Sequence, residues 1–122
     1  MVTADVDRGA EVVAGLDRAG IRVAVALWTF LSDYEDWRLV LSSRRFDASA
    51  TRDAYRLLHS SLEPGGFTPK NTPPIMIFPM SDPFIKELRR MFAGAKSVEG
   101  MRLGGQMIGG RFVEDAYVYR IS

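Results

Sequence analysis

Apolar residues recur every three to four positions at the start of the chain, within residues 4–19. They are Val6, Ala10, Val13 and Leu16. This spacing predicts an amphipathic helix. Gly20 is expected to end it, because glycine readily adopts the left-handed conformation found after helix C-termini.

The pattern then becomes an extended one. Ile21 to Leu31 is rich in β-branched and aromatic residues and is apolar at both alternations, which predicts a central strand covered on both faces. Residues 32–36 are polar and typical of a turn, and Trp37 to Ser42 returns as a second strand. The two strands are expected to form a hairpin with an acidic loop.

A second helix is predicted from Ala50 to Leu62, with Asp47 or Ser49 as its cap. The following segment, Gly66 to Pro74, contains three prolines, which favour an extended and partly stiff loop. A third helix is predicted after this loop, beginning at Asp82-Pro83 and ending at Gly94.

Between the Pro-rich loop and the third helix, the segment Ile75 to Phe78 is wholly apolar and predicts a short strand. The third helix begins at a clear signal, in which Asp82 caps the helix and Pro83 takes its first position. Crossovers through the second and third helices imply parallel pairing around this short strand.

The chain ends in a predicted second hairpin, Met101 to Ile108 and Arg111 to Ile121, with a turn at Gly109-Gly110. Gly104-Gly105 in its first arm indicates a bulge or a close approach of two backbones. Side chains alternate along a strand. A continuous strand would place Phe112, Glu114, Ala116, Val118 and Arg120 on one face, and Val113, Asp115, Tyr117, Tyr119 and Ile121 on the other.

These elements follow the order α-β-β-α-β-α-β-β. Their sum predicts one α+β domain over residues 1–122, with a mixed sheet of about five strands and three helices. The length of 122 residues suits one hydrophobic core.

Composition adds few restrictions on function. A formal net charge of +1 provides no global field toward nucleic acid or an anionic membrane, although local basic patches remain. The absence of cysteine removes disulfides and thiolate chemistry, and with an acidic start that lacks a secretory signal it favours the cytoplasm. We expect no cofactor, no metal and no membrane partner.

Three short segments carry a resemblance. Ala26-Leu27-Trp28, Trp37-Arg38-Leu39-Val40 and Glu114-Asp115-Ala116-Tyr117-Val118-Tyr119-Arg120 together resemble a widespread group of small bacterial proteins of unknown function. The resemblance implies the same single domain and carries no activity or functional residues to transfer.

Glu114 and Asp115 are the candidate catalytic residues, because clustered carboxylates hold hard cations or act as acid and base. The competing interpretation is structural: Asp115 accepts hydrogen bonds, and Glu114 pairs with an arginine such as Arg120, Arg111 or Arg102. A second acidic group, Asp33, Glu35, Asp36 and Asp47, matches no calcium loop.

The candidate binding residues are basic and aromatic. Arg44-Arg45, Arg52 with Arg56, and Arg89-Arg90 form local clusters suited to phosphate or an acidic protein. Tyr34 and Trp37 are candidates for stacking on bases or anchoring a partner, and Arg120 is a candidate for phosphate. The lone histidine, His59, excludes a two-histidine site within one chain.

Three functions remain open. The first is a non-catalytic binding or accessory protein that presents the first hairpin and the Pro-rich loop to another protein or a second copy. The second is a small metal-dependent hydrolase or nuclease using Glu114 and Asp115, with Asp33, Asp36 or Asp82 and with Arg44 and Arg120 steadying a phosphate. The third is a nucleic-acid-binding module using Arg44, Arg45 and Trp37.

Overall fold

The most apolar strand of the chain lies at the centre of a five-stranded sheet, as predicted. The computed structural model describes residues 3–48 and 50–122. The strand order is β3-β2-β1-β7-β4, with β2 and β3 parallel and the other pairs antiparallel. The strands are β1 (Val25–Leu31), β2 (Asp36–Ser42), β3 (Ile75–Ile77), β4 (Arg102–Leu103) and β7 (Ala116–Ile121). The predicted mixed sheet of an α+β domain is thus confirmed.

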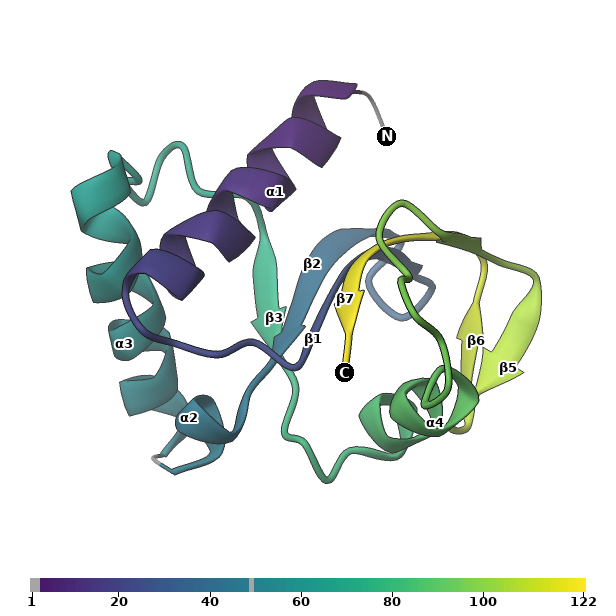
Figure 1. The fold of residues 1–122 in the computed structure, drawn as a ribbon. Coiled ribbons are helices and arrows are strands. Elements are labelled where there is room, and N and C mark those ends of the chain that lie inside the picture. Colours follow the sequence, from purple (N-terminus) through teal and green to yellow (C-terminus); the bar gives the residue numbers. More distant parts are fainter. Residues whose placement is uncertain (1–2, 49) are drawn as a thin grey trace.

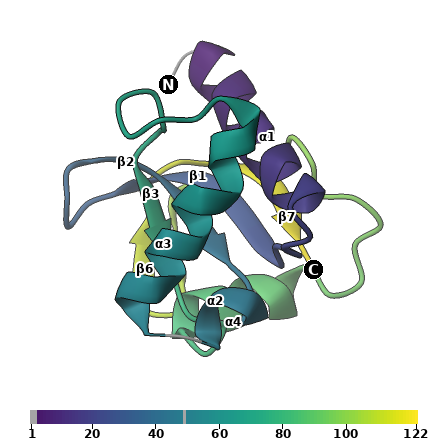
Figure 2. The same cartoon turned by 90° about the vertical axis from the view of Figure 1, so that its left-hand side faces the viewer.

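Helices cover both faces of this sheet, so the sheet separates two hydrophobic clusters. Figure 1 shows α1 and α3 on one side and α4 on the other, and Figure 2 looks onto the α3 side. Alternation along β1 sends Val25 and Leu27 toward α4, and Ala26 and Trp28 toward α1 and α3. The helices of the described residues are α1 (Thr3–Arg18), α2 (Arg44–Asp47), α3 (Thr51–Leu62) and α4 (Pro83–Met91), with a 3-10 turn η1 (Glu63–Gly65).

Helix α1 contacts the sheet at a glycine, Gly9, which the predicted apolar stripe did not include. Gly9 is buried, whereas Ala10, assigned to the stripe, is exposed. The Tyr119 hydroxyl donates to the main-chain oxygen of Val6 (2.6 Å), and Trp28 Nε1 donates to that of Asp5 (3.1 Å). A Cβ at position 9 would overlap these two side chains, so the missing side chain lets the helix approach the sheet.

The C-terminal half of the predicted second hairpin is not one continuous strand. A separate hairpin, β5 (Gln106–Ile108) and β6 (Arg111–Val113), carries the Gly109-Gly110 turn, with φ of 57° and 81° at the two glycines. The chain leaves the strand conformation at Glu114 and Asp115 before β7 begins. A Cβ at Gly104 would lie 2.7 Å from the main-chain oxygen of Glu114, which confirms the predicted close backbone approach.

This break makes the predicted alternation wrong. Val113, Ala116, Val118 and Ile121 all belong to the cluster beneath α4, although strict alternation divided them between faces. Two irregularities cause this: the interruption before β7, and a register shift in the pairing with β1 that leaves Tyr119 without a partner on that strand.

Helix starts were predicted with mixed success. Asp82 caps α4 by accepting from the main-chain nitrogen of Phe84 (2.9 Å), with Pro83 first in the helix, as predicted. Asp47 does not cap α3, because it ends the unpredicted helix α2 and accepts from the main-chain nitrogen of Met80 instead (3.1 Å). The alternative cap, Ser49, lies outside the described residues.

The neighbouring parallel strands β2 and β3 send the chain to opposite faces. From β2 it continues into α2 and α3 on one face, and from β3 it continues into α4 on the other. In open sheets with helices on both faces, such a divergence leaves a crevice beyond the carboxyl ends of the strands, where ligands commonly bind.

Candidate functional site

A pocket of about 680 Å³ lies at this end of the sheet. It is bordered by the residues that follow β2, β3 and β7 and by the residue that precedes β1: Ser43, Met80, Ser122 and Ala24. Its other lining residues are Gly20, Arg22, Arg44, Arg45, Ala48 and Arg89. We call it the arginine pocket. No Asp or Glu side chain is among the described residues that line it.

The arginines of this pocket differ from most others in the chain. Seven of the 13 arginines form ion pairs with carboxylates elsewhere. Within residues 3–48 and 50–122, six have no such partner: Arg18, Arg22, Arg44, Arg45, Arg52 and Arg89. Four of these six line the one pocket. Its positive charge is therefore not neutralised by carboxylate side chains of the protein that the structure describes.

The wall that carries Arg22, Arg44 and Arg45 is fixed by a buried serine. Ser43, only 1% exposed, donates from Oγ to the main-chain oxygen of Arg22 (2.6 Å) and accepts from the main-chain nitrogen of Arg45 (3.2 Å). The second bond makes Ser43 the cap of α2. Ser43 thus holds the loop before β1 against the start of α2, and both segments direct arginines to the same pocket.

The opposite wall comes from α4 and the segment before it. Ile85 and Leu88 are buried in the cluster under the sheet and fix the helix, while Arg89 donates from Nε to the main-chain oxygen of Ser122 (2.7 Å). Met80 is held by its main-chain bond to Asp47. The arginine pocket is thus built by secondary-structure elements from both faces of the sheet.

Chemically, this arrangement suits the binding of oxyanions. Each guanidinium presents five N–H donors in a planar fork that matches phosphate and carboxylate oxygens. No Asp, Glu, His or Tyr side chain is among the described lining residues, and His59 lies beside a different pocket with Glu63 and Phe67. The lining therefore supplies charge and hydrogen-bond donors but no recognised general base.

The structure brings Arg44 and Arg45 together, but it places Arg120 elsewhere. Arg120 forms a two-pronged ion pair with Asp17 of α1 (3.0 and 2.9 Å). The hydrogen bonds from the Arg120 guanidinium lower the pKa of the Asp17 carboxyl, and the pKa of Arg120 is raised by the hydrogen bonds that it donates to Asp17. Arg120 therefore fastens α1 to β7.

The candidate catalytic residues do not come together with other acids. Asp115 accepts from Nη2 of Arg102 through both carboxylate oxygens (3.1 and 2.9 Å), and its main-chain oxygen accepts from the main-chain nitrogen of Phe30 of β1. Glu114 is exposed and pairs with none of Arg102, Arg111 and Arg120. The predicted pairing of Glu114 is wrong, because its three proposed partners bind Asp115, Asp33 and Asp17.

The remaining loop acids are similarly dispersed. Asp33 pairs with Arg111 (3.3 Å), Asp36 pairs with Arg38 (3.0 Å), and Asp82 is occupied as a helix cap. Among the residues that the structure describes, no group of three or more His, Asp or Glu side chains could hold a metal ion.

The aromatic candidates lie away from the arginine pocket. Trp37 is half-buried and packs edge to face on Phe30, with ring centroids 5.9 Å apart. Tyr34 is 52% exposed in the first hairpin loop, with the Arg38 guanidinium 5.4 Å from its ring centroid. Trp37 and Ser43 stand at opposite ends of β2, roughly 20 Å apart at the usual rise per residue.

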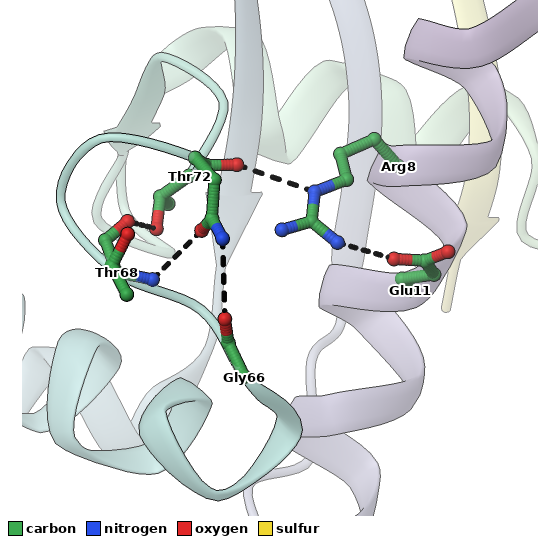
Figure 3. Close-up of polar contacts among 6 residues, drawn as sticks. Arg8, Glu11, Gly66, Thr68 and Thr72 are labelled. Carbon is green, nitrogen blue, oxygen red and sulfur yellow. Dashed lines mark hydrogen bonds and ion pairs between the residues drawn. The ribbon is translucent and has the colours of Figure 1, made fainter.

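The Pro-rich loop is a compact turn and not the extended segment that was expected. Figure 3 shows Arg8 reaching from α1 to this loop while also binding Glu11 (2.5 Å). Arg8 donates to the main-chain oxygen of Asn71 (3.2 Å) and stacks over Phe67 (4.0 Å to the ring centroid). The Asn71 side chain bonds back to Thr68 N and Gly66 O, which folds the loop upon itself.

Two residues of the pocket escaped sequence reasoning. Arg22 stands alone between apolar neighbours and was absorbed into a predicted strand, and Ser43 gave no sign of linking two segments. A Ser directly before Arg44-Arg45-Phe46 is a helix-cap signal that identifies Ser43 in retrospect. No local pattern connects Arg22 with Arg89.

No family model, curated protein or solved structure matches the chain. The resemblance to small bacterial proteins therefore stays a prediction. Within the described part of the chain, no helix has both the length and the apolar character needed to cross a membrane.

Proposed function

We propose that the protein is a non-catalytic binding protein that holds a phosphate-bearing ligand in the arginine pocket. One observation carries the proposal: four of the six arginines that have no Asp or Glu ion-pair partner among the described residues line one pocket without an acidic side chain. The lining carries four like charges and no acidic side chain, so a bound anion would be attracted to it.

Phosphate is favoured over other anions by the residue type. Arginine binds phosphate through paired, charge-assisted hydrogen bonds, whereas a lysine acts only as a point charge. All four cationic residues of the pocket are arginines, although the chain also contains three lysines. The position beyond the carboxyl ends of β2 and β3 adds support, because this is a common ligand site in such sheets.

The proposal is tested by thermal unfolding with increasing sodium pyrophosphate, against sodium chloride at equal ionic strength. A ligand that binds only the folded state raises the melting temperature in proportion to the logarithm of its concentration above Kd. The double variant R44A/R45A should lose this rise, whereas R52A, which removes an unpaired arginine outside the pocket, should keep it.

Two results would contradict the proposal. The first is a rise that sodium chloride reproduces. The second is a rise that survives in R44A/R45A, because the anion would then bind somewhere other than the arginine pocket.

Association with a protein partner or a second copy remains a second candidate, and one exposed pair favours it. Met107 and Phe112 lie directly opposite each other on β5 and β6 and are 64% and 43% exposed. The edge of β3 is less suited, because the Tyr55 hydroxyl already accepts from the main-chain nitrogen of Ile77 (2.9 Å).

Light scattering during gel filtration tests this second candidate. Self-association through the exposed pair predicts a concentration-dependent mass that M107S/F112S lowers to that of one chain. A single-chain mass for the unaltered protein at high concentration would exclude a second copy as the occupant.

A further inference from the structure

The inference made here rests on the proposed function and names the class of ligand. We infer that the arginine pocket binds a small organic molecule with a chain of two or more phosphate groups, such as a nucleoside triphosphate. Charge, volume and the apolar part of the pocket lining each support this class over free phosphate and over a nucleic-acid strand.

The charge of the pocket exceeds what one phosphate neutralises. Arg22, Arg44, Arg45 and Arg89 bring four positive charges to the lining. A single phosphate group carries roughly −1.5 to −2 at neutral pH, so it would leave about half of this charge uncompensated. A chain of two or three phosphates supplies enough negative charge and enough oxygens for all four guanidinium groups.

The volume of the pocket also exceeds one phosphate. At about 680 Å³, it lies within the range of roughly 300–1,000 Å³ typical of sites for drug-sized ligands. The arginines come from three separate segments that line this space: the loop before β1, α2 and α4. A phosphate held by one wall would leave the rest of the space to water.

Part of the lining is apolar and suits an organic group. Met80, Ala24 and Ala48 contribute apolar surface beside the arginines, and Gly20 adds main chain without a side chain. We therefore assign the phosphate chain to the arginines and the organic part of the ligand to this apolar wall.

A nucleic-acid strand fits the surroundings less well. A strand needs a positive track that continues beyond the pocket and aromatic platforms for its bases. Arg90 on α4 is paired with Glu87, Arg56 on α3 is paired with Asp53, and Trp37 lies toward the far end of β2. Both requirements are therefore poorly met near the pocket.

Isothermal titration calorimetry in magnesium-free buffer tests the inference with four probes: orthophosphate, tripolyphosphate, ATP and a single-stranded oligonucleotide. ATP is expected to bind at least about tenfold more tightly than orthophosphate, since each additional charge-assisted bond is worth about that factor. Tripolyphosphate should fall between them. R44A and R89A should each weaken ATP binding by about tenfold, and R52A should leave it unchanged.

The outcomes separate this inference from the proposed function. Orthophosphate binding as tightly as ATP overturns the inference while the proposed function stands. Equal affinities for tripolyphosphate and ATP overturn it as well, because the apolar wall would then contribute nothing. Tighter binding of the oligonucleotide than of ATP overturns it in favour of a strand. Failure of all four probes overturns both proposals.

Discussion

The Ser43 hydroxyl joins Arg22 to Arg45: it donates 2.6 Å to the main-chain oxygen of Arg22 and accepts 3.2 Å from the main-chain nitrogen of Arg45. The two arginines are far apart in the sequence and lie on different elements. One buried side chain therefore sets the relative position of the two segments that carry Arg22 and Arg45 on one wall of the arginine pocket.

Ser43→Ala is expected to lower the free energy of unfolding by about 1–2 kcal/mol, because it removes a helix cap and a buried hydrogen bond. It should also weaken pyrophosphate binding, since the loop that carries Arg22 loses its attachment to α2. Urea unfolding and calorimetry measure the two effects.

Ser42→Ala is the matched control for this change. Ser42 is equally buried, but its hydroxyl has no partner among the described residues. Its removal should leave stability unchanged or slightly raised. Equal effects of the two substitutions would contradict the role assigned to Ser43.

Gly9→Ala is expected to destabilise the protein, although alanine favours helices by about 1 kcal/mol over glycine. The added Cβ would lie 2.7 Å from Trp28 Nε1 and would overlap the Tyr119 hydroxyl. Overpacking of this kind costs about 1–3 kcal/mol. Chemical unfolding measures the loss, and Gly94→Ala, whose Cβ would meet nothing within 4 Å, is the control. A more stable G9A would refute this packing of α1.

Gly109→Ala and Gly110→Ala separate strain from contact. Both positions have positive φ (57° and 81°), which costs an alanine roughly 1–2 kcal/mol. A Cβ at Gly109 would also overlap the main-chain oxygen of Pro83, whereas one at Gly110 meets nothing within 4 Å. G109A should therefore lose clearly more stability than G110A in urea unfolding. Equal losses would mean that the hairpin turn does not rest on α4.

The partly buried hydroxyl of Tyr119 should make the free energy of unfolding depend on pH in the alkaline range. Burial raises the pKa of its hydroxyl from 10.0 to about 12 in the folded protein. The unfolded chain therefore loses this proton first, and stability falls as pH rises from about 10 to about 12. The advantage of the unaltered protein over Tyr119→Phe in urea unfolding should shrink across that window. A constant difference between the two would contradict this effect.

The sequence was sufficient for most of the fold because its signals are local. The two-sided apolar character of Ile21 to Leu31 predicted the central strand, and Asp82-Pro83 predicted the start of α4. Gly109-Gly110 predicted a tight turn because consecutive positive φ values strongly favour glycine. Each of these features depends on neighbouring residues only.

The interruption at Glu114 and Asp115 was missed because its cause is distant. The two acids looked like residues inside a strand, although the main-chain oxygen of Asp115 turns instead to Phe30 and Thr29 of β1. The Asp115 carboxylate is then paired with Arg102. The alternation of side chains along a strand cannot show where the register between two strands shifts. The faces predicted for the side chains of residues 112–121 were wrong for this reason.

The candidate site was only partly predictable. Arg44 and Arg45 were identified as a local basic pair, and Arg89 was noted in a separate cluster, but nothing local linked them to each other or to Arg22. Their convergence depends on β2 and β3 lying side by side while the chain leaves these strands toward opposite faces. The order of strands in the sheet depends on contacts between distant segments, so no single segment of the sequence predicts it.

The most direct test of the arginine pocket is to follow the arginine Nε–Hε signals by NMR during titration with pyrophosphate. If the arginine pocket binds the anion, the signals of Arg22, Arg44, Arg45 and Arg89 will shift together and saturate at one Kd, while that of Arg102, paired with Asp115 near the opposite end of β7, will stay in place. Uniform small shifts of all arginines, or saturation at a site that excludes Arg44 and Arg45, would contradict it.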